Sequence, residues 1–188
     1  MKLYHSVFIL LLSFLGCREV IVPKPKAFLN LTYPDAIYQK TALELPFKFD
    51  KNKLAVVEGI QHKESSQSLN LNYPLIKAKL YLSYHPLDEN LSRYVSETEF
   101  TTKNHAKVAH EVTEQKFENF RTNVFGKMYE LTGPVASQCQ FYVTDSSQHF
   151  LTGSLYFKVK PNYDSILPAV RYLQKDMIRL VESLEWKF

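Results

Sequence analysis

Hydrophobic and polar side chains alternate through the middle of the chain. In residues 76–84 apolar residues take every second position, and lysine, tyrosine or serine takes the positions between them. A period of two predicts a strand with one buried face. Residues 140–144 and 150–159 form a second pair of such runs around the polar turn 145–149, which predicts a hairpin. Gly153 falls on the apolar face of the returning strand, so we expect another element to approach closely there.

The C-terminal region has a helical rather than a strand period. Its apolar residues recur every three or four positions, as Ile166, Val170, Leu173, Met177, Leu180 and Leu184. This spacing predicts an amphipathic helix that closes the chain. Proline is tolerated in the first turn of a helix, so Pro168 favours Ser165 as the N-cap, with Asp164 as the alternative.

A second helix is expected over residues 88–103, with Leu91, Tyr94, Val95 and Thr98 on a weaker inner face. The period of residues 108–120 leaves open whether this helix continues or the chain returns as a strand. Together the elements predict an α+β domain. Its sheet is largely antiparallel, and its last helix lies across the sheet.

The N-terminus has the features of an export signal. Lys2 precedes an apolar run over residues 7–15, which is shorter than the roughly 20 residues that span a bilayer. Such a length is typical of a secretory signal peptide, here residues 1–16. Gly16 followed by Cys17 is similar to a bacterial lipobox, in which cleavage leaves a diacylated cysteine, although Phe14-Leu15 departs from the usual pattern. We expect Cys17 to be lipidated; an ordinary cleaved signal or a buried helix is the alternative.

Prolines divide the remaining chain into a tether and a domain. Pro23 and Pro25 favour stiff, extended backbone, and further prolines delay regular structure until Pro46. We therefore expect a lipidated tether over residues 17–45 and a single α+β domain over residues 46–188, which is long enough to bury a core.

Charge and cysteine content narrow the functional classes. The formal net charge is +4, and the lysines are scattered rather than clustered, so nucleic acid is not an expected partner. An acylated Cys17 could not pair with Cys139, so no intramolecular disulfide is expected.

The residues needed for catalysis are not grouped in any known motif. His62, His85, His105, His110 and His149 form neither an HxH nor an HExxH pair, which argues against a zinc site. Cys139 precedes an apolar strand and is expected to be a small buried hydrophobe. The serines near glycine match neither a GxSxG elbow nor a phosphate loop. We therefore expect no catalytic residue, metal or cofactor, and a protein that is not an enzyme.

Tyrosines suggest a contact surface instead. The strand period places Tyr81, Tyr142 and Tyr156 on the sheet face opposite the aliphatic residues. Either the mid-chain helix covers this face or another protein binds it. We expect the contact on the hairpin, through Tyr142, Asp145, His149 and Tyr156. The alternative is that Asp145 only stabilises its own turn.

Several segments together resemble one known family. They are NLNYPLIKAKLYLSY at residues 70–84, ASQCQFYVTDSSQHFLTGSLYF at residues 136–157, KPNYDS at residues 160–165, and a last helix closing on Trp186. With the lipidation site and the proline-containing tether, these segments resemble the gliding motility lipoprotein GldD family of Bacteroidetes over nearly the whole chain.

The resemblance implies an envelope lipoprotein required for gliding, tied to the type IX secretion machinery. Its partners would be the membrane, through Cys17, and other gliding or secretion proteins; the absence of an acidic run after Cys17 favours the periplasmic side. A lipoprotein that binds a small ligand and a hydrolase are the alternatives. Bacteria of this group also glycosylate D-S/T-apolar triplets, so Ser165 is a candidate acceptor, although capping is preferred. The fold is also similar to the α/β/α sandwich of PsbP and Mog1, a likeness of fold alone.

Overall fold

A computed structural model of the chain describes residues 31–63, 66–158 and 163–187. Within these residues, an antiparallel sheet has the strand order β4-β5-β6-β10-β9-β8-β7. Its strands are β4 (Val56–Lys63), β5 (Ser66–Tyr73), β6 (Ala78–Pro86), β7 (Glu111–Asn119), β8 (Val124–Thr132), β9 (Ser137–Thr144) and β10 (His149–Phe157). The helices are α2 (Leu91–Ala106), α3 (Tyr163–Glu182) and the 3-10 turn η1 (Pro74–Ile76). Short strands β1 (Tyr38–Lys40) with β3 (Asp50–Asn52), and β2 (Phe47–Lys48) with β11 (Glu185–Trp186), form two small ribbons.

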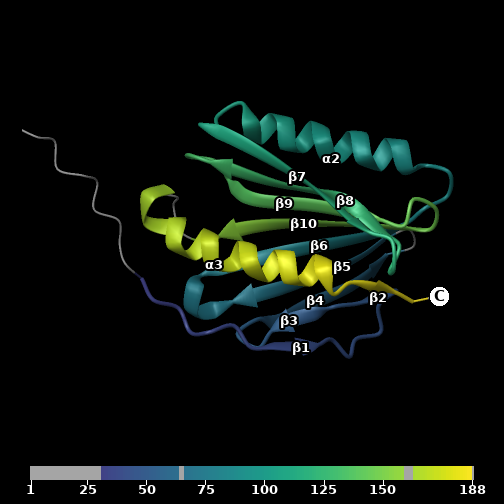
Figure 1. Cartoon of the computed structure of the whole chain (residues 1–188), viewed down its shortest axis with the longest axis horizontal. Coiled ribbons are helices and arrows are strands. Elements are labelled where there is room, and N and C mark those ends of the chain that lie inside the picture. Colours follow the sequence, from purple (N-terminus) through teal and green to yellow (C-terminus); the bar gives the residue numbers. More distant parts are fainter. Residues whose placement is uncertain (1–30, 64–65, 159–162, 188) are drawn as a thin grey trace, which may run out of the picture.

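The two long helices cover opposite faces of the sheet. Phe150 and Leu151 are consecutive on β10, so their side chains point to opposite sides. Phe150 packs with residues of α2, whereas Leu151 belongs to the larger core that contains the apolar residues of α3. In Figure 1, α3 crosses the near side of the sheet, and α2 lies along its upper edge. The expected α+β fold is confirmed, and its layer order is α/β/α.

The alternating pattern of β6 is confirmed. Ala78, Leu80, Leu82 and Tyr84 are buried on the α3 side, while the residues between them lie on the other face. Burial of each leucine side chain stabilises the fold by about 1.5–3 kcal/mol. The expected hairpin is also present as β9 and β10.

Gly153 has the close neighbour that the sequence predicts. It lies directly opposite Phe141 on β9, and a Cβ atom added at Gly153 would overlap the Phe141 ring. The aromatic ring therefore fills the space that a side chain would need.

Helix boundaries differ from the expected ones. α2 begins at Leu91, because Glu89 adopts a left-handed conformation (φ 52°) that interrupts the helix. The open segment 108–120 is resolved as strand β7, which pairs with β8 in regular register. α3 begins at Tyr163, so the expected N-cap at Ser165 is wrong: this serine is the third helical residue, and Pro168 lies inside the helix.

Packed structure begins upstream of Pro46. β1 pairs with β3, Thr41 and Leu45 are buried, and the Thr41 hydroxyl donates to the Phe49 carbonyl oxygen at 2.9 Å. Part of the segment expected to be tether thus packs on the domain. Signal residues 1–16 and Cys17 lie outside the described residues. Neither of the described long helices combines the length and apolar character needed to cross a bilayer.

Candidate partner-binding surface

Two of the hairpin residues expected at a contact surface are buried. Tyr142 and His149 are each 6% exposed. Tyr142 lies on the α2 side, with its ring 5.7 Å from that of Phe150. His149 lies on the α3 side, where it stacks on Trp186 at 4.8 Å and its Nδ1 is 2.9 Å from the Tyr84 hydroxyl. Burial lowers the pKa of His149. Both side chains pack the interior, where a partner on the surface does not reach them.

Asp145 organises the turn between β9 and β10. Its Oδ1 accepts from the amides of Ser147, Gln148 and His149 at 3.0, 2.8 and 2.8 Å. Burial acts to raise the pKa of Asp145, but these amides outweigh it and hold the pKa below its ordinary value. Asp145 therefore has the turn-stabilising role that was the simpler alternative.

The fourth hairpin residue, Tyr156, lies on a part of the sheet that α2 leaves bare. α2 packs against β8, β9 and β10, while Tyr81 on β6 is 46% exposed. An open depression of about 560 Å³ lies here. It is lined by Tyr81, Ser83, Thr152, Ser154 and Tyr156, which we call the tyrosine face. The mid-chain helix thus covers Tyr142 but leaves Tyr81 exposed and Tyr156 half-buried.

The backbone fixes the tyrosine face. β6 and β10 are neighbours in the sheet, and Ser83 is directly opposite Thr152 while Tyr81 is opposite Ser154. The rings of Tyr81 and Tyr156 meet edge to face, with centroids 5.6 Å apart. This is a favourable aromatic arrangement, and it fixes the two rings relative to one another on the sheet.

A polar group that the sequence did not reveal borders the tyrosine face. Glu58 on β4 accepts from Asn72 Nδ2 at 2.7 Å and pairs with Lys79 Nζ at 2.9 Å. The hydrogen bond from Lys79 lowers the pKa of Glu58. Lys79 Nζ also lies 5.7 Å from the centre of the Tyr81 ring. The ion pair and the cation–π contact both hold Lys79 beside the exposed tyrosine.

Ser83 and His85 form a contact that no sequence motif indicates. Ser83 Oγ lies 3.2 Å from His85 Nε2, and burial lowers the pKa of His85. A serine nucleophile needs such a base, together with a third group that orients the base. Among the described residues no carboxylate is hydrogen-bonded to His85.

Other reactive groups in the described chain are not assembled either. Residues 31–63, 66–158 and 163–187 contain no cluster of three His, Cys, Asp or Glu side chains that could hold a metal ion. Cys139 is fully buried, and burial raises the pKa of its thiol to about 12, so it is protonated at neutral pH. Ser165 is half-buried in the first turn of α3.

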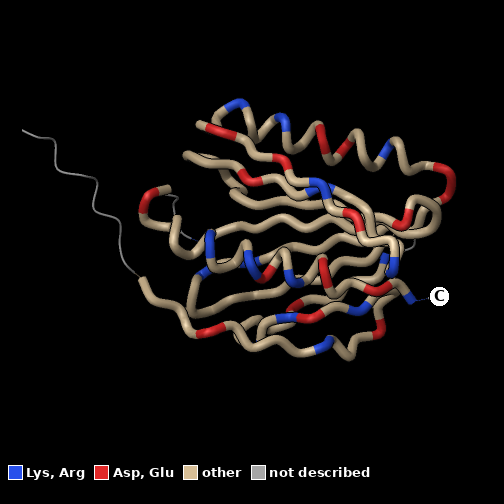
Figure 2. Tube along the Cα trace, in the orientation of Figure 1, with Lys and Arg blue, Asp and Glu red and all other residues tan. Residues whose placement is uncertain are grey.

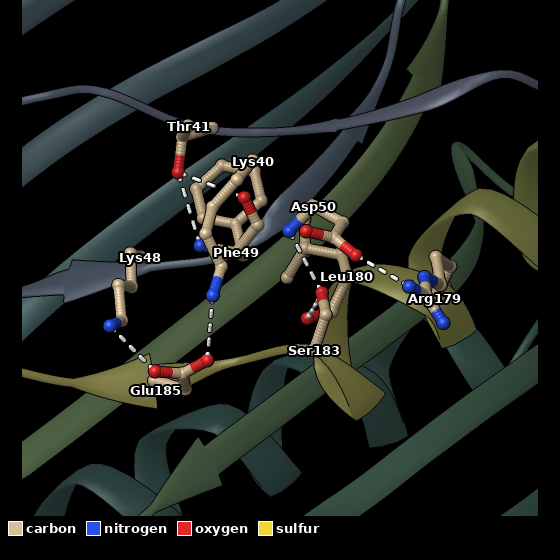
Figure 3. Close-up of polar contacts among 9 residues, drawn as sticks. All are labelled: Lys40, Thr41, Lys48, Phe49, Asp50, Arg179, Leu180, Ser183 and Glu185. Carbon is tan, nitrogen blue, oxygen red and sulfur yellow. Dashed lines mark hydrogen bonds and ion pairs between the residues drawn. The ribbon is translucent and has the colours of Figure 1, made fainter.

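A second polar region fastens the N-terminal ribbons to the end of the chain (Figure 3). The Glu185 carboxylate pairs with Lys40 at 2.9 Å and Lys48 at 2.7 Å, and these lysines lower its pKa to about 2. Asp50 pairs with Arg179 at 2.6 Å, and its backbone amide donates to Ser183 Oγ at 2.8 Å. The segment before β4 is therefore held against α3 and β11.

Asp176 adds a buried anchor to this region. It is only 4% exposed, and burial raises its pKa. Its carboxylate accepts from the Tyr38 hydroxyl at 2.7 Å and from Asn52 Nδ2 at 2.9 Å. In the sequence, the only indication of this buried carboxylate is an acid beside the apolar residues Leu173 and Met177 of α3. The hydrogen-bond partners of Asp176 lie far away along the chain.

The fold and its surfaces define a layered α+β domain with a preformed, exposed aromatic sheet face. Residues 18–186 match the family model described as gliding motility lipoprotein GldD, and the chain belongs to this family. A search of curated proteins gives no match. The resemblance read from the sequence is thereby confirmed, and the family supports a lipoprotein that is anchored in the cell envelope and related to gliding motility.

Proposed function

We propose that this protein is a non-catalytic lipoprotein of the gliding machinery, and that it binds another envelope protein through the tyrosine face. The pair formed by exposed Tyr81 and half-buried Tyr156 carries this proposal. Tyrosine combines an apolar ring with a polar hydroxyl and loses little conformational entropy on binding. The neighbouring serine and threonine hydroxyls offer adaptable hydrogen bonds, so the composition matches that of protein-binding surfaces.

The finer assignments of anchor and location belong to the same proposal. Cys17 carries the lipid, the segment that follows it is the tether, and the domain faces the periplasm beside the type IX secretion machinery. The short apolar run 7–15 and the Gly16-Cys17 junction support lipidation. Two acyl chains give stable membrane anchoring where one does not.

The binding role is tested with the double variant Tyr81→Ala/Tyr156→Ala. Co-purification from detergent-solubilised membranes, with the tagged full chain as bait, should lose the partner, because truncating a central interface tyrosine costs about 2 kcal/mol or more. Phe100→Ala is the matched control, since Phe100 is an exposed aromatic residue on α2 outside the tyrosine face. A double variant that keeps its fold, its membrane level and its partner would refute the proposal.

The Ser83–His85 contact makes a hydrolase the second candidate, and Ser83→Ala separates the two. On the binding proposal, loss of one hydroxyl at the edge of the face leaves gliding intact, with a change in partner affinity of about tenfold at most. A nucleophile would behave differently, because its removal abolishes turnover. Gliding of a deletion strain that expresses Ser83→Ala is the measurement. Complete loss of movement at normal protein level would favour the hydrolase.

A further inference from the structure

A cleft lies where the N-terminal segment meets α3. It has a volume of about 410 Å³, and residues 31–36 with Tyr38 form one wall while α3 forms the other. The rings of Tyr33 and Tyr172 pack against one another where the two walls meet, with centroids 5.1 Å apart. Asp176 lies at its base, already bonded to Tyr38. We call this the N-terminal cleft.

Two cations on the wall of the cleft have no partner in the described part of the chain. Arg171 and Lys175 are exposed, are one helical turn apart on α3, and make no ion pair or hydrogen bond with any described residue. Arg179, one turn further along, is instead paired with Asp50. Figure 2 shows basic and acidic residues interspersed along α3. Asp35 lines the opposite wall, and Asp176 on α3 is buried and already bonded to Tyr38 and Asn52, so Arg171 and Lys175 are the exposed charges of the α3 wall.

The other wall exposes apolar side chains. Leu31 lines the cleft and is 48% exposed, and Ile37, which lies beside the cleft and does not line it, is 57% exposed. Aliphatic, tyrosine and basic side chains together make up the surfaces that proteins place at the membrane–water interface. The aliphatic groups enter the acyl boundary, tyrosine lies at the level of the headgroups, and the cations bind lipid phosphates.

The length of chain between the proposed anchor and this cleft allows the cleft to reach the bilayer. Leu31 follows Cys17 by 14 residues (31 minus 17). An extended chain spans at most about 3.6 Å per residue, so Leu31 can lie no more than about 50 Å from a lipidated Cys17. The cleft is therefore at the part of the described domain that the chain connects most directly to the membrane.

We propose that the N-terminal cleft and its apolar rim form a second membrane contact, in which Arg171 and Lys175 bind the phosphates of anionic phospholipid headgroups. The contact rests on the lipid anchor of the proposed function. It also deepens that function, because α3 and the tyrosine face lie on opposite sides of the sheet. A domain that rests on the membrane through α3 turns the tyrosine face away from the bilayer, toward other envelope proteins.

Lysine footprinting of the full, anchored chain tests this contact. The protein is reconstituted in vesicles of phosphatidylcholine, with or without phosphatidylglycerol, and treated with a membrane-impermeant amine reagent. Each lysine or arginine held near an anionic surface changes the equilibrium constant for membrane contact by about fivefold. Labelling of Lys175 should fall by at least that factor when phosphatidylglycerol is present. Lys103, exposed on α2, is the internal control and should not change.

A variant and an inorganic phosphate control test whether the protection comes from lipid headgroups. Arg171→Gln should restore Lys175 labelling in the anionic vesicles, because the variant lacks the neighbouring cation that binds phosphate. Position 171 is exposed on the helix, so the substitution should leave the fold intact. Inorganic phosphate added to the phosphatidylcholine vesicles should give no protection. Equal labelling of Lys175 in both vesicles, or equal protection by free phosphate, would overturn the membrane contact. Partner capture by the tyrosine face has a separate readout, so either idea can fail alone.

Discussion

Among single residues, Asp176 shows most clearly what holds the domain to its N-terminal segment. It brings together Tyr38 and Asn52, which are 138 and 124 positions away in sequence. Hydrogen bonds to a buried carboxylate stabilise by about 1.5–3 kcal/mol each, and losing the acceptor leaves buried donors unsatisfied. No sequence period links positions so far apart, which is why this anchor could not be predicted from the sequence.

The raised pKa of Asp176 predicts a specific pH dependence. A carboxyl whose pKa is higher in the folded than in the unfolded state binds protons more tightly when folded, so its contribution to stability falls as pH rises above its ordinary value of 3.8. The asparagine of Asp176→Asn cannot ionise, so the variant does not lose this contribution to stability as pH rises. Urea unfolding at several pH values should show the stability of Asp176→Asn relative to the native chain rising with pH. A difference that stays constant with pH would contradict the assignment.

The tyrosine face shows what the sequence can and cannot predict at a site. Strand alternation correctly placed Tyr81 and Tyr156 on one face of the sheet. It could not predict that α2 would cover Tyr142 alone, since this depends on where a helix of residues 91–106 crosses the sheet. The same limit explains His149, which lies beside a polar turn in sequence but stacks on Trp186 from the end of the chain.

At the scale of elements, the sequence shows a hydrophobic period only where a helix or strand buries one of its faces. β6 and α3 each bury one face, so the spacing of their apolar residues predicted both elements. β7 is an edge strand whose residues are almost all exposed, and its polar sequence therefore carries no period that separates strand from helix. The helix starts were missed because local backbone conformation, as at Glu89, competes with capping preferences.

The β9–β10 hairpin makes a prediction of its own at Gly153. Gly153→Ala places a methyl group against the Phe141 ring on the neighbouring strand, and such overpacking of a core destabilises by about 1–3 kcal/mol. Ser154→Ala, one residue further along on the opposite face, is the matched control and should change little. Urea unfolding midpoints measure both. Equal stability of the two variants would show that the ring moves aside freely.

For the whole molecule, the two faces of the sheet have different surroundings. The α3 side carries the N-terminal ribbons, the polar contacts of Glu185 and Asp50, and the N-terminal cleft (Figure 3). The α2 side carries the bare tyrosine face. The proposed membrane contact would lie on the α3 side and the proposed protein contact on the α2 side, so the two could be made at the same time.

Gliding by a deletion strain that expresses Tyr81→Ala/Tyr156→Ala tests this account most directly. Thermal unfolding and membrane fractionation of the variant establish that it folds and reaches the envelope. We expect a folded, anchored double variant that fails to restore gliding, while Phe100→Ala restores it fully. Full movement with the double variant would contradict a role for the tyrosine face in gliding.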